Sequence, residues 1–396
     1  MLKIIYLDNA ATTYPKPEEV YEIMDRTNRN CAFNTGRGSY KAARKLNELL
    51  ENTRDKIVNL VYGDCHNVVF TPSVTIALNQ IINGLEAVNS KNDAVVYVSP
   101  YEHNAVARTL VLLKSKRESI KSGLIIRELP INPETLEIDL DKVKYDFAME
   151  PPALICCNHI SNVTGYILPV QSIFEYGKEY NSINILDASQ SLGLVKIIED
   201  RANSHFINAD FIAFAGHKSL YGPFGAAGFI TNNKYELAPY IAGGTGSDSL
   251  NLYMPEEITV GQEPGSHNIV AIAGLSAALD NIEHNMIEDV YKYEKKLTDK
   301  LIDGLKKNRN IKLYLPANMH NHIAIVSFNV KGYKADEVGK ILDEDFDIAV
   351  RTGYHCAPYI HKWLHSEEYA GTVRASIGRY TTEEDIESLI DALEEL

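Results

Sequence analysis

Short, nearly continuous runs of apolar residues recur along the first part of the chain, from about residue 18 to residue 235. They lie at 68–70, 95–99, 124–129, 153–158, 183–187 and 211–216. Such runs are typical of strands buried on both faces. Segments with helical spacing, including 74–85 and 173–180, lie between them. The alternation predicts an α/β fold with a doubly wound, mainly parallel sheet that binds ligands at the carboxyl ends of its strands.

The pattern changes after about Gly265. A long helical stretch is followed by further apolar and helical segments, at 323–330, at 348–353 and from Glu383. This part of the chain predicts a smaller α+β domain. Segments rich in Gly and Ser, at 243–249 and 261–266, indicate the crossing between the domains. We therefore predict a large α/β domain at 16–260 and a small domain made of 1–15 and 261–396.

Length, net charge and cysteine content disfavour several classes of protein. The chain has 396 residues, which favours two domains, and its net charge of −14 disfavours a nucleic-acid partner. The apolar start, residues 1–10, is too short for a signal peptide or a membrane span, so we expect a cytoplasmic protein. Five cysteines without a CxxC pair disfavour a disulfide framework and a structural zinc site.

Two residues with catalytic potential follow predicted strands. Lys218 comes after the run 211–216 in a glycine-lined turn. Partial burial there would lower its pKa and let its amine attack an aldehyde, whereas the alternative is a solvated surface lysine. Asp187 ends another strand and would suit the cationic ring nitrogen of pyridoxal phosphate, but taken alone it favours the alternative, a helix N-cap.

The turn at 71–75 leads from a strand into a helix. Backbone N–H groups at such a helix start bind anions, and the hydroxyls of Thr75 and Ser73 would add donors. The same pattern also describes an ordinary capped helix. His103 follows the strand at 95–99, where it would stack on a flat ring or serve as a hydrogen-bonded loop residue.

Cys356 lies in a loop after the strand-like segment 348–353, beside Arg351 and His355. Positive charge from these two neighbours would raise its thiolate fraction, which suits a nucleophile. The alternative is an inert buried thiol. We expect that alternative for the remaining cysteines, which are Cys156, Cys157, Cys31 and Cys65.

These residues lie in motifs that, in their order and spacing, resemble the cysteine desulfurases and their selenocysteine lyase relatives among the class V, fold-type I pyridoxal-phosphate enzymes. The motifs are YLDNAATT (6–13), TPSVTIALN (71–79), EHN (102–104), SNVTG (161–165), DASQ (187–190), GHKSLYGPFG (216–225), GGTGS (243–247), EPGSHN (263–268), RTGYHCAP (351–358) and GTVRAS (371–376). The resemblance spans nearly the whole chain. It implies a large domain with a mainly parallel, seven-stranded sheet.

The resemblance also implies roles for individual residues. Lys218 would form a Schiff base with pyridoxal 5'-phosphate, His103 would stack on the ring, and Cys356 would accept sulfur from L-cysteine. The cofactor-binding residues would be Lys218, Asp187, Gln190, His103, Thr75, Val74, His217, Asn162 and Ser266. The substrate-binding residues would be Arg374, Asn162, Ala11 and Arg351. Ser266 would act from the neighbouring subunit of a homodimer, and a sulfur-acceptor protein would be a further partner.

Two positions depart from the family pattern. Ala215 replaces a serine or threonine that often contacts the phosphate, and Tyr354 replaces a histidine in the cysteine loop. His361 and His365 follow that loop, and the simplest interpretation of the pair is a surface loop. The first departure removes a hydroxyl contact to the phosphate, and the second leaves the sulfur acceptor and the substrate open. Two rival functions stay open: a selenocysteine lyase or other class V enzyme that catalyses β-elimination or transamination, and a noncatalytic sulfur-trafficking scaffold.

Overall fold

We describe the protein from a computed structural model. The structure describes residues 4–35, 40–61, 67–89, 93–119, 123–200, 205–246, 249–282 and 284–396. Cys65, which we expected to be inert, and residues 247–248 of the predicted crossing lie outside these ranges. Within them, no helix is both long enough and apolar enough to cross a membrane.

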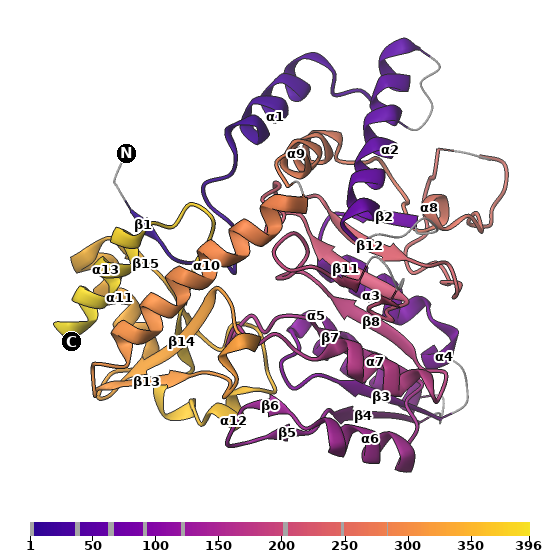
Figure 1. The fold of residues 1–396 in the computed structure, drawn as a ribbon. Coiled ribbons are helices and arrows are strands. Elements are labelled where there is room, and N and C mark those ends of the chain that lie inside the picture. Colours follow the sequence, from indigo (N-terminus) through magenta and orange to yellow (C-terminus); the bar gives the residue numbers. More distant parts are fainter. Residues whose placement is uncertain are drawn as a thin grey trace.

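A seven-stranded sheet forms the centre of the molecule (Figure 1). Its order is β2 (Asn67–Thr71), β12 (Ala227–Thr231), β11 (Phe211–Ala215), β8 (Ile183–Asp187), β7 (Leu154–Asn158), β3 (Ala94–Val98) and β4 (Leu124–Glu128). The strands from β11 to β4 pair in parallel, and β12 is antiparallel to both of its neighbours. The predicted mainly parallel sheet is confirmed, and its strands other than β12 fall on the apolar runs.

Helices cover both faces of this sheet, which explains why its strands are apolar throughout. Side chains alternate along each strand, so Val69 and Cys156 face one core, whereas Val68 and Cys157 face the other. The first core is closed by α3 (Val74–Gly84) and α5 (Asn104–Glu118). The second is closed by α2 (Lys41–Val61), α6 (Leu140–Met149), α7 (Val170–Lys178) and α9 (Ile269–Asp280).

A second sheet is built from the C-terminal part of the chain. Its antiparallel order is β13 (Ile311–Tyr314), β14 (Ile325–Val330), β17 (Thr372–Ser376) and β16 (Arg351–Gly353). Buried side chains of α10 (His284–Leu305), α11 (Ala335–Phe346) and α13 (Glu383–Glu394) complete its core. Strands and helices thus combine as the α+β pattern predicted.

The start of the chain forms a separate two-stranded sheet with a C-terminal strand. β1 (Ile5–Tyr6) pairs in parallel with β15 (Ile348–Ala349), and Figure 1 shows it among the C-terminal elements. By contrast, α9 lies within the range assigned to the small domain but packs on α1 (Glu18–Asn30) and α2. The exact domain limits stay a prediction.

Short elements complete the described fold without contributing to either main sheet. The short strands are β5 (Ile131–Asn132), β6 (Glu137–Ile138), β9 (Ile198–Asp200) and β10 (His205–Phe206). The short helices are α4 (Glu86–Asn89), α8 (Ile258–Gly261) and α12 (His361–Leu364).

Candidate active site

The predicted site residues of the large domain gather at the carboxyl edge of its sheet. Asp187 is the last residue of β8, Lys218 follows β11, and His103 stands between β3 and α5. Asn162 lies in the loop after β7. Because the carboxyl ends of parallel strands meet at one edge, the fold brings these residues together in space.

Lys218 is held in a tight turn after β11. The turn needs glycine at position 216, because a Cβ there would stand 2.2 Å from the Ala226 carbonyl oxygen. The hydroxyl of Thr13 donates to the Lys218 carbonyl at 3.1 Å. Burial lowers the pKa of Lys218 and outweighs the opposing effect of Asp187, and the charges of Arg374 and Arg351 lower the pKa further. The amine therefore loses its proton more readily than a surface lysine does.

Asp187 is buried, with 8% of its surface exposed. One carboxylate oxygen, Oδ1, accepts hydrogen bonds from the Ser189 backbone N–H at 2.9 Å and from the Ser189 hydroxyl at 2.5 Å. These contacts cap a turn, and no helix begins at residues 187–195, so the helix N-cap alternative is wrong. Both use Oδ1, which leaves Oδ2 for a positively charged ligand group.

His103 begins α5 as its N-cap. Its Nδ1 accepts the Ala105 N–H at 3.0 Å, so the ring proton is on Nε2. Burial and the nearby Lys218 charge lower the pKa of His103 to about 4, which keeps the ring neutral at pH 7. The preceding residue, Glu102, is fully buried, and burial together with Asp187 raises its pKa well above the usual range.

The predicted phosphate-binding residues lie on two segments. Ser73 is the N-cap of α3 and accepts the Ile76 N–H at 3.4 Å, while Val74 and Thr75 form the first turn. His217 stacks on Phe224 with ring centroids 4.5 Å apart. Burial, assisted by the charge of Lys218, lowers the pKa of His217 to about 4, so it offers a phosphate a hydrogen bond rather than a charge.

Cys356 lies exposed in a loop whose backbone is unusual. His355 and Cys356 both have positive φ, 47° and 57°. The Cys356 carbonyl accepts the Asn104 N–H at 2.7 Å, which ties the cysteine loop to the start of α5. The thiol belongs to the same electrostatic environment as Lys218, whose pKa it influences.

One expectation for this loop is wrong. We predicted that His355 would supply positive charge to the thiolate, but its side chain is buried and its Nε2 contacts the Thr372 hydroxyl at 2.8 Å. Burial and the charge of Arg374 lower the pKa of His355 well below its ordinary value. The ring is therefore neutral at pH 7, which leaves Arg351 as the predicted cationic neighbour.

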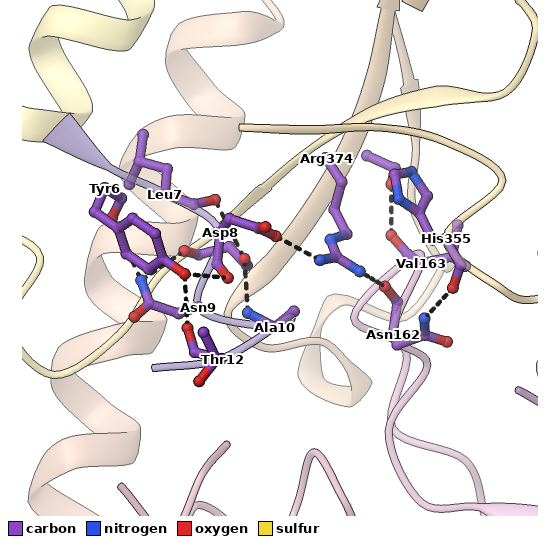
Figure 2. A network of polar contacts seen from close by, with 12 residues as sticks. Tyr6, Leu7, Asp8, Asn9, Ala10, Thr12, Asn162, Val163, His355 and Arg374 are labelled. Atoms are coloured by element: carbon purple, nitrogen blue, oxygen red, sulfur yellow. Dashed lines mark hydrogen bonds and ion pairs between the residues drawn. The ribbon is translucent and has the colours of Figure 1, made fainter. Parts of the chain in front are cut away.

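Arg374 links three parts of the chain (Figure 2). Its Nη2 donates to Asp8 Oδ1 at 2.7 Å, and its Nη1 donates to the Asn162 carbonyl at 2.9 Å. The amide of Asn162 donates in turn to the His355 carbonyl at 2.8 Å. Arg351 is the cross-strand partner of Arg374 in the C-terminal sheet. This network places two guanidinium groups beside the cysteine loop.

The remaining predicted site residues are Gln190, Ala11 and Ser266. Gln190 donates to the Ala10 carbonyl at 2.8 Å, and the Ala11 N–H donates to the Asp8 carbonyl at 3.0 Å. Ser266 is exposed, accepts a hydrogen bond from Asn34 at 3.1 Å and lines a pocket with Thr71 and Pro72, in the turn before α3. Its predicted action across a subunit interface stays a prediction.

A family model for class-V aminotransferases matches residues 5–389. The chain belongs to the class-V aminotransferase family. The predicted resemblance is thereby confirmed for essentially the whole sequence.

Two relatives of known sequence carry the same description. A "Probable cysteine desulfurase" of Pyrococcus abyssi is 32% identical over 399 residues, covering 100% of this chain and 94% of the relative. A protein of the same description from Methanothermobacter thermautotrophicus is also 32% identical, covering 99% and 94%. The solved cysteine desulfurase of Thermococcus onnurineus NA1 superimposes with a TM-score of 0.88 at 29% identity, covering 99% of this chain and 94% of that one. The predicted fold-type I architecture is confirmed.

Sequence reasoning missed some residues that shape this class-V site. Asp8 stands inside the motif YLDNAATT, but nothing in the sequence indicated that it pairs with Arg374. The motif EHN was recognised for His103, whereas the structure adds a buried Glu102 and the Asn104 N–H contact with Cys356. Motif membership was the available signal in each case, but the partner of each residue lies far away in sequence.

Proposed function

We propose that this protein is a cysteine desulfurase that uses pyridoxal 5'-phosphate. The reaction converts L-cysteine and the Cys356 thiol into L-alanine and a Cys356 persulfide. One sulfur atom moves from the substrate to the enzyme, and no oxidant or reductant is needed. The observation that carries the proposal is the convergence of an amine, an acid and a thiol: Asp187 pairs with Ala213 on the strand that leads into Lys218, and the Cys356 carbonyl accepts the Asn104 N–H next to His103. The description shared by the relatives supports the same reaction.

The residues present fit the cofactor. His217 Nδ1 is buried and, among the described residues, has no hydrogen-bond partner, as expected for a donor that awaits a phosphate oxygen. Asp187 Oδ2 would face the ring nitrogen, and the N–H groups at the start of α3 would hold the phosphate with Thr75. When bound, pyridoxal phosphate supplies an electron sink for negative charge at the substrate α-carbon.

Arg374 and Arg351 would hold the substrate carboxylate. Arg374 is 1% exposed and is fixed by Asp8 and Asn162, so its planar fork is already oriented. No hydrogen bond or ion pair of the Arg351 side chain occurs among the described residues, so its charge is available to a ligand. Asn162 and Ala11 would complete the substrate side of the site.

Lys218 and Cys356 would carry out the chemistry. The lowered pKa of Lys218 allows its free amine to take a proton from the substrate α-carbon and to return it later. The Cys356 sulfur forms the new S–S bond while the carbon–sulfur bond of the substrate breaks. His103, neutral at pH 7, would lie against the ring without adding a competing charge.

We further propose a homodimer, a sulfur-acceptor protein as partner and a cytoplasmic location. Support for a second copy of the chain comes from the loop after Ser249, where Leu250 is 96%, Leu252 97% and Tyr253 85% exposed. Four cysteines are free in the described part of the chain, which fits a reducing compartment.

The proposal is tested by measuring alanine and sulfide from L-cysteine with purified protein, pyridoxal phosphate and dithiothreitol. Cys356→Ala is expected to keep the cofactor absorbance and to lose at least about a thousandfold in rate, the scale for loss of a nucleophile. Cys31→Ala removes a partly exposed thiol elsewhere and serves as the matched control with an unchanged rate.

The rival functions give different results in the same assay. A selenocysteine lyase or another β-eliminating or transaminating enzyme would turn over selenocysteine or cysteine sulfinate faster, and it would not need Cys356. A noncatalytic scaffold would show no pyridoxal absorbance. Unchanged turnover of L-cysteine by Cys356→Ala would refute the role assigned to that thiol.

A further inference from the structure

Every backbone carbonyl from Tyr354 to Cys356 accepts a hydrogen bond. The Tyr354 carbonyl accepts from the Ala357 N–H at 3.0 Å and from the His361 ring at 3.0 Å. Asn162 donates to the His355 carbonyl at 2.8 Å, and the Asn104 N–H donates to the Cys356 carbonyl at 2.7 Å. The cysteine loop is therefore held in one conformation rather than left free in solvent.

The backbone conformation of the cysteine loop depends on these hydrogen bonds. His355 and Cys356 are consecutive residues with a Cβ in the left-handed region, at φ 47° and 57°. Left-handed backbone is unfavourable for residues other than glycine and persists only where surrounding contacts determine it. In this conformation the thiol is exposed while the His355 ring is buried. The loop contacts therefore decide where the thiol of Cys356 points.

His361 is the loop partner that the sequence did not reveal. Its side chain is buried, with 3% exposed, although the sequence favoured a surface position. Its Nε2 faces the Tyr354 carbonyl, and its Nδ1 lies 2.8 Å from the hydroxyl of Ser366. A carbonyl can only accept, so Nε2 carries the proton and Nδ1 accepts from Ser366. Both ring nitrogens are thus satisfied in one neutral tautomer.

The His361 ring forms a bridge between Ser366 and Tyr354. Ser366 is fully buried, and its carbonyl accepts the Gly371 N–H at 3.0 Å, just before β17. On the other side, the ring of Tyr354 meets the His361 ring edge-on, with centroids 4.9 Å apart. His361 therefore connects the cysteine loop to the segment that leads into the strand of Arg374.

We propose that His361 is a positioning residue for Cys356, which fixes the loop so that the thiol meets the substrate sulfur and then remains accessible to an acceptor. Cys356 and His361 also line one surface groove together with Arg108, Lys362 and Glu367, where an acceptor would approach. The inference rests on the proposed desulfurase function. In this inference Tyr354, which stands where the family pattern has a histidine, helps to hold the loop through the contacts of its backbone carbonyl and its ring with His361.

The test uses two substitutions of His361 whose side chains differ in length. Gln at position 361 can place a donor where His Nε2 stands, whereas Asn is too short to do so. We expect His361→Asn to lower the rate of sulfide formation about tenfold or more, since small displacements of a reacting group cost rates of this size. His361→Gln should recover to within about threefold of the wild type, and KM for L-cysteine should change little in both.

Hydrogen exchange provides a readout that does not depend on activity. The Ala357 and Asn104 N–H groups donate to the Tyr354 and Cys356 carbonyls, so their exchange reports on the loop. His361→Asn should lose protection at both amides, and His361→Gln should keep it. His365→Asn is the matched control: His365 is exposed and left-handed, a conformation that Asn tolerates, so rate and exchange should stay as in the wild type.

The outcomes separate this inference from the proposed function. If the wild type forms no alanine or sulfide, the proposed function fails, whereas the exchange experiment still decides the loop contact. If the wild type is active and His361→Asn matches it in rate and exchange, the positioning role is wrong. It is also wrong if His361→Gln is as slow as His361→Asn. If His361→Asn does not fold, slow turnover by Ser366→Ala with an intact fold would support the bridge, and wild-type turnover would contradict it.

Discussion

The guanidinium of Arg374 donates a hydrogen bond to the carboxylate of Asp8, 2.7 Å away and 366 residues earlier in the chain. Arg374 is buried, and the Asp8 side chain is 22% exposed. The pair ties the N-terminal segment to β17 and orients the arginine that we propose for substrate binding. It also supplies the negative charge that a buried guanidinium requires.

Asp8→Asn should therefore destabilise the protein, because it leaves the charge of Arg374 without an anion. We expect the free energy of unfolding to fall by roughly 3 kcal/mol, the lower end for breaking a buried pair. Urea denaturation measures this change. Asp25→Asn breaks the exposed pair with Arg29 and should cost less than about 1 kcal/mol. Equal effects of the two substitutions would contradict the account.

The positions of the main strands could be predicted because continuous apolar runs report burial on both faces. β12 was not predicted, since its five residues, AGFIT, form a weak run, and its antiparallel pairing depends on two distant strands. The same limit applied within the site. The types and order of Lys218, Asp187 and Cys356 indicated the chemistry, but the Asp8 pair depends on a tertiary contact that no local pattern encodes.

Besides tertiary pairing, the burial of individual side chains could not be predicted from the sequence. His355 and His361 stand beside polar and aromatic residues and resemble an exposed basic loop, yet both are buried and hydrogen-bonded. Their rings are neutral because the fold removes them from water, and this effect arises only when β16, β17 and α12 assemble.

A second buried ion pair anchors the segment that carries Ser266. Arg54 Nη2 lies 2.7 Å from Glu263 Oε2, and the Phe70 N–H donates to Glu263 Oε1 at 2.6 Å. Glu263→Gln should lower the free energy of unfolding by about 3 kcal/mol, because Arg54 keeps its buried charge with Glu51, 3.7 Å from its Nε, as the remaining carboxylate partner. The measurement is again urea denaturation.

The matched control is Glu150→Gln, whose partner Arg127 is half exposed. It should cost no more than about 1 kcal/mol. Replacing both buried partners, as in Arg54→Met with Glu263→Leu, should recover part of the loss, since no unpaired charge remains. A double variant less stable than Glu263→Gln would count against this explanation.

Two buried histidines predict sensitivity to acid. Burial lowers the pKa of His159 and of His322 from 6.5 to about 4. Below pH 6.5 the unfolded chain takes up these protons and the folded chain does not until about pH 4. Stability is therefore full above pH 6.5 and falls as the pH drops toward 4, by about 3 kcal/mol for each histidine.

Urea midpoints at pH 7.5 and pH 5 test this prediction. The midpoint should be lower at pH 5, and His322→Gln, which cannot take up a proton, should show a smaller difference between the two values. Control measurements on His320→Gln, an exposed neighbour, should keep the wild-type difference. A midpoint that does not change between pH 7.5 and pH 5 would show that these rings are not held neutral.

Arg351 provides a test of substrate binding. Because Arg351 lies across from Arg374 in the sheet and its side chain has no partner among the described residues, Arg351→Gln should raise KM for L-cysteine about tenfold and change kcat less, as expected for uniform binding. Steady-state kinetics measures the split, and Arg309→Gln on the surface is the control. An unchanged KM would remove Arg351 from the substrate site.

In the proposed reaction Lys218, Asp187 and Cys356 act together on one substrate. The most direct measurement is a single turnover of stoichiometric L-cysteine without reductant, followed by mass spectrometry of the cysteine peptides. We predict one alanine per site and a gain of one sulfur atom on the peptide of Cys356, with neither product in Lys218→Ala. Alanine formed without added mass at Cys356, or sulfur found on another cysteine, would contradict the account.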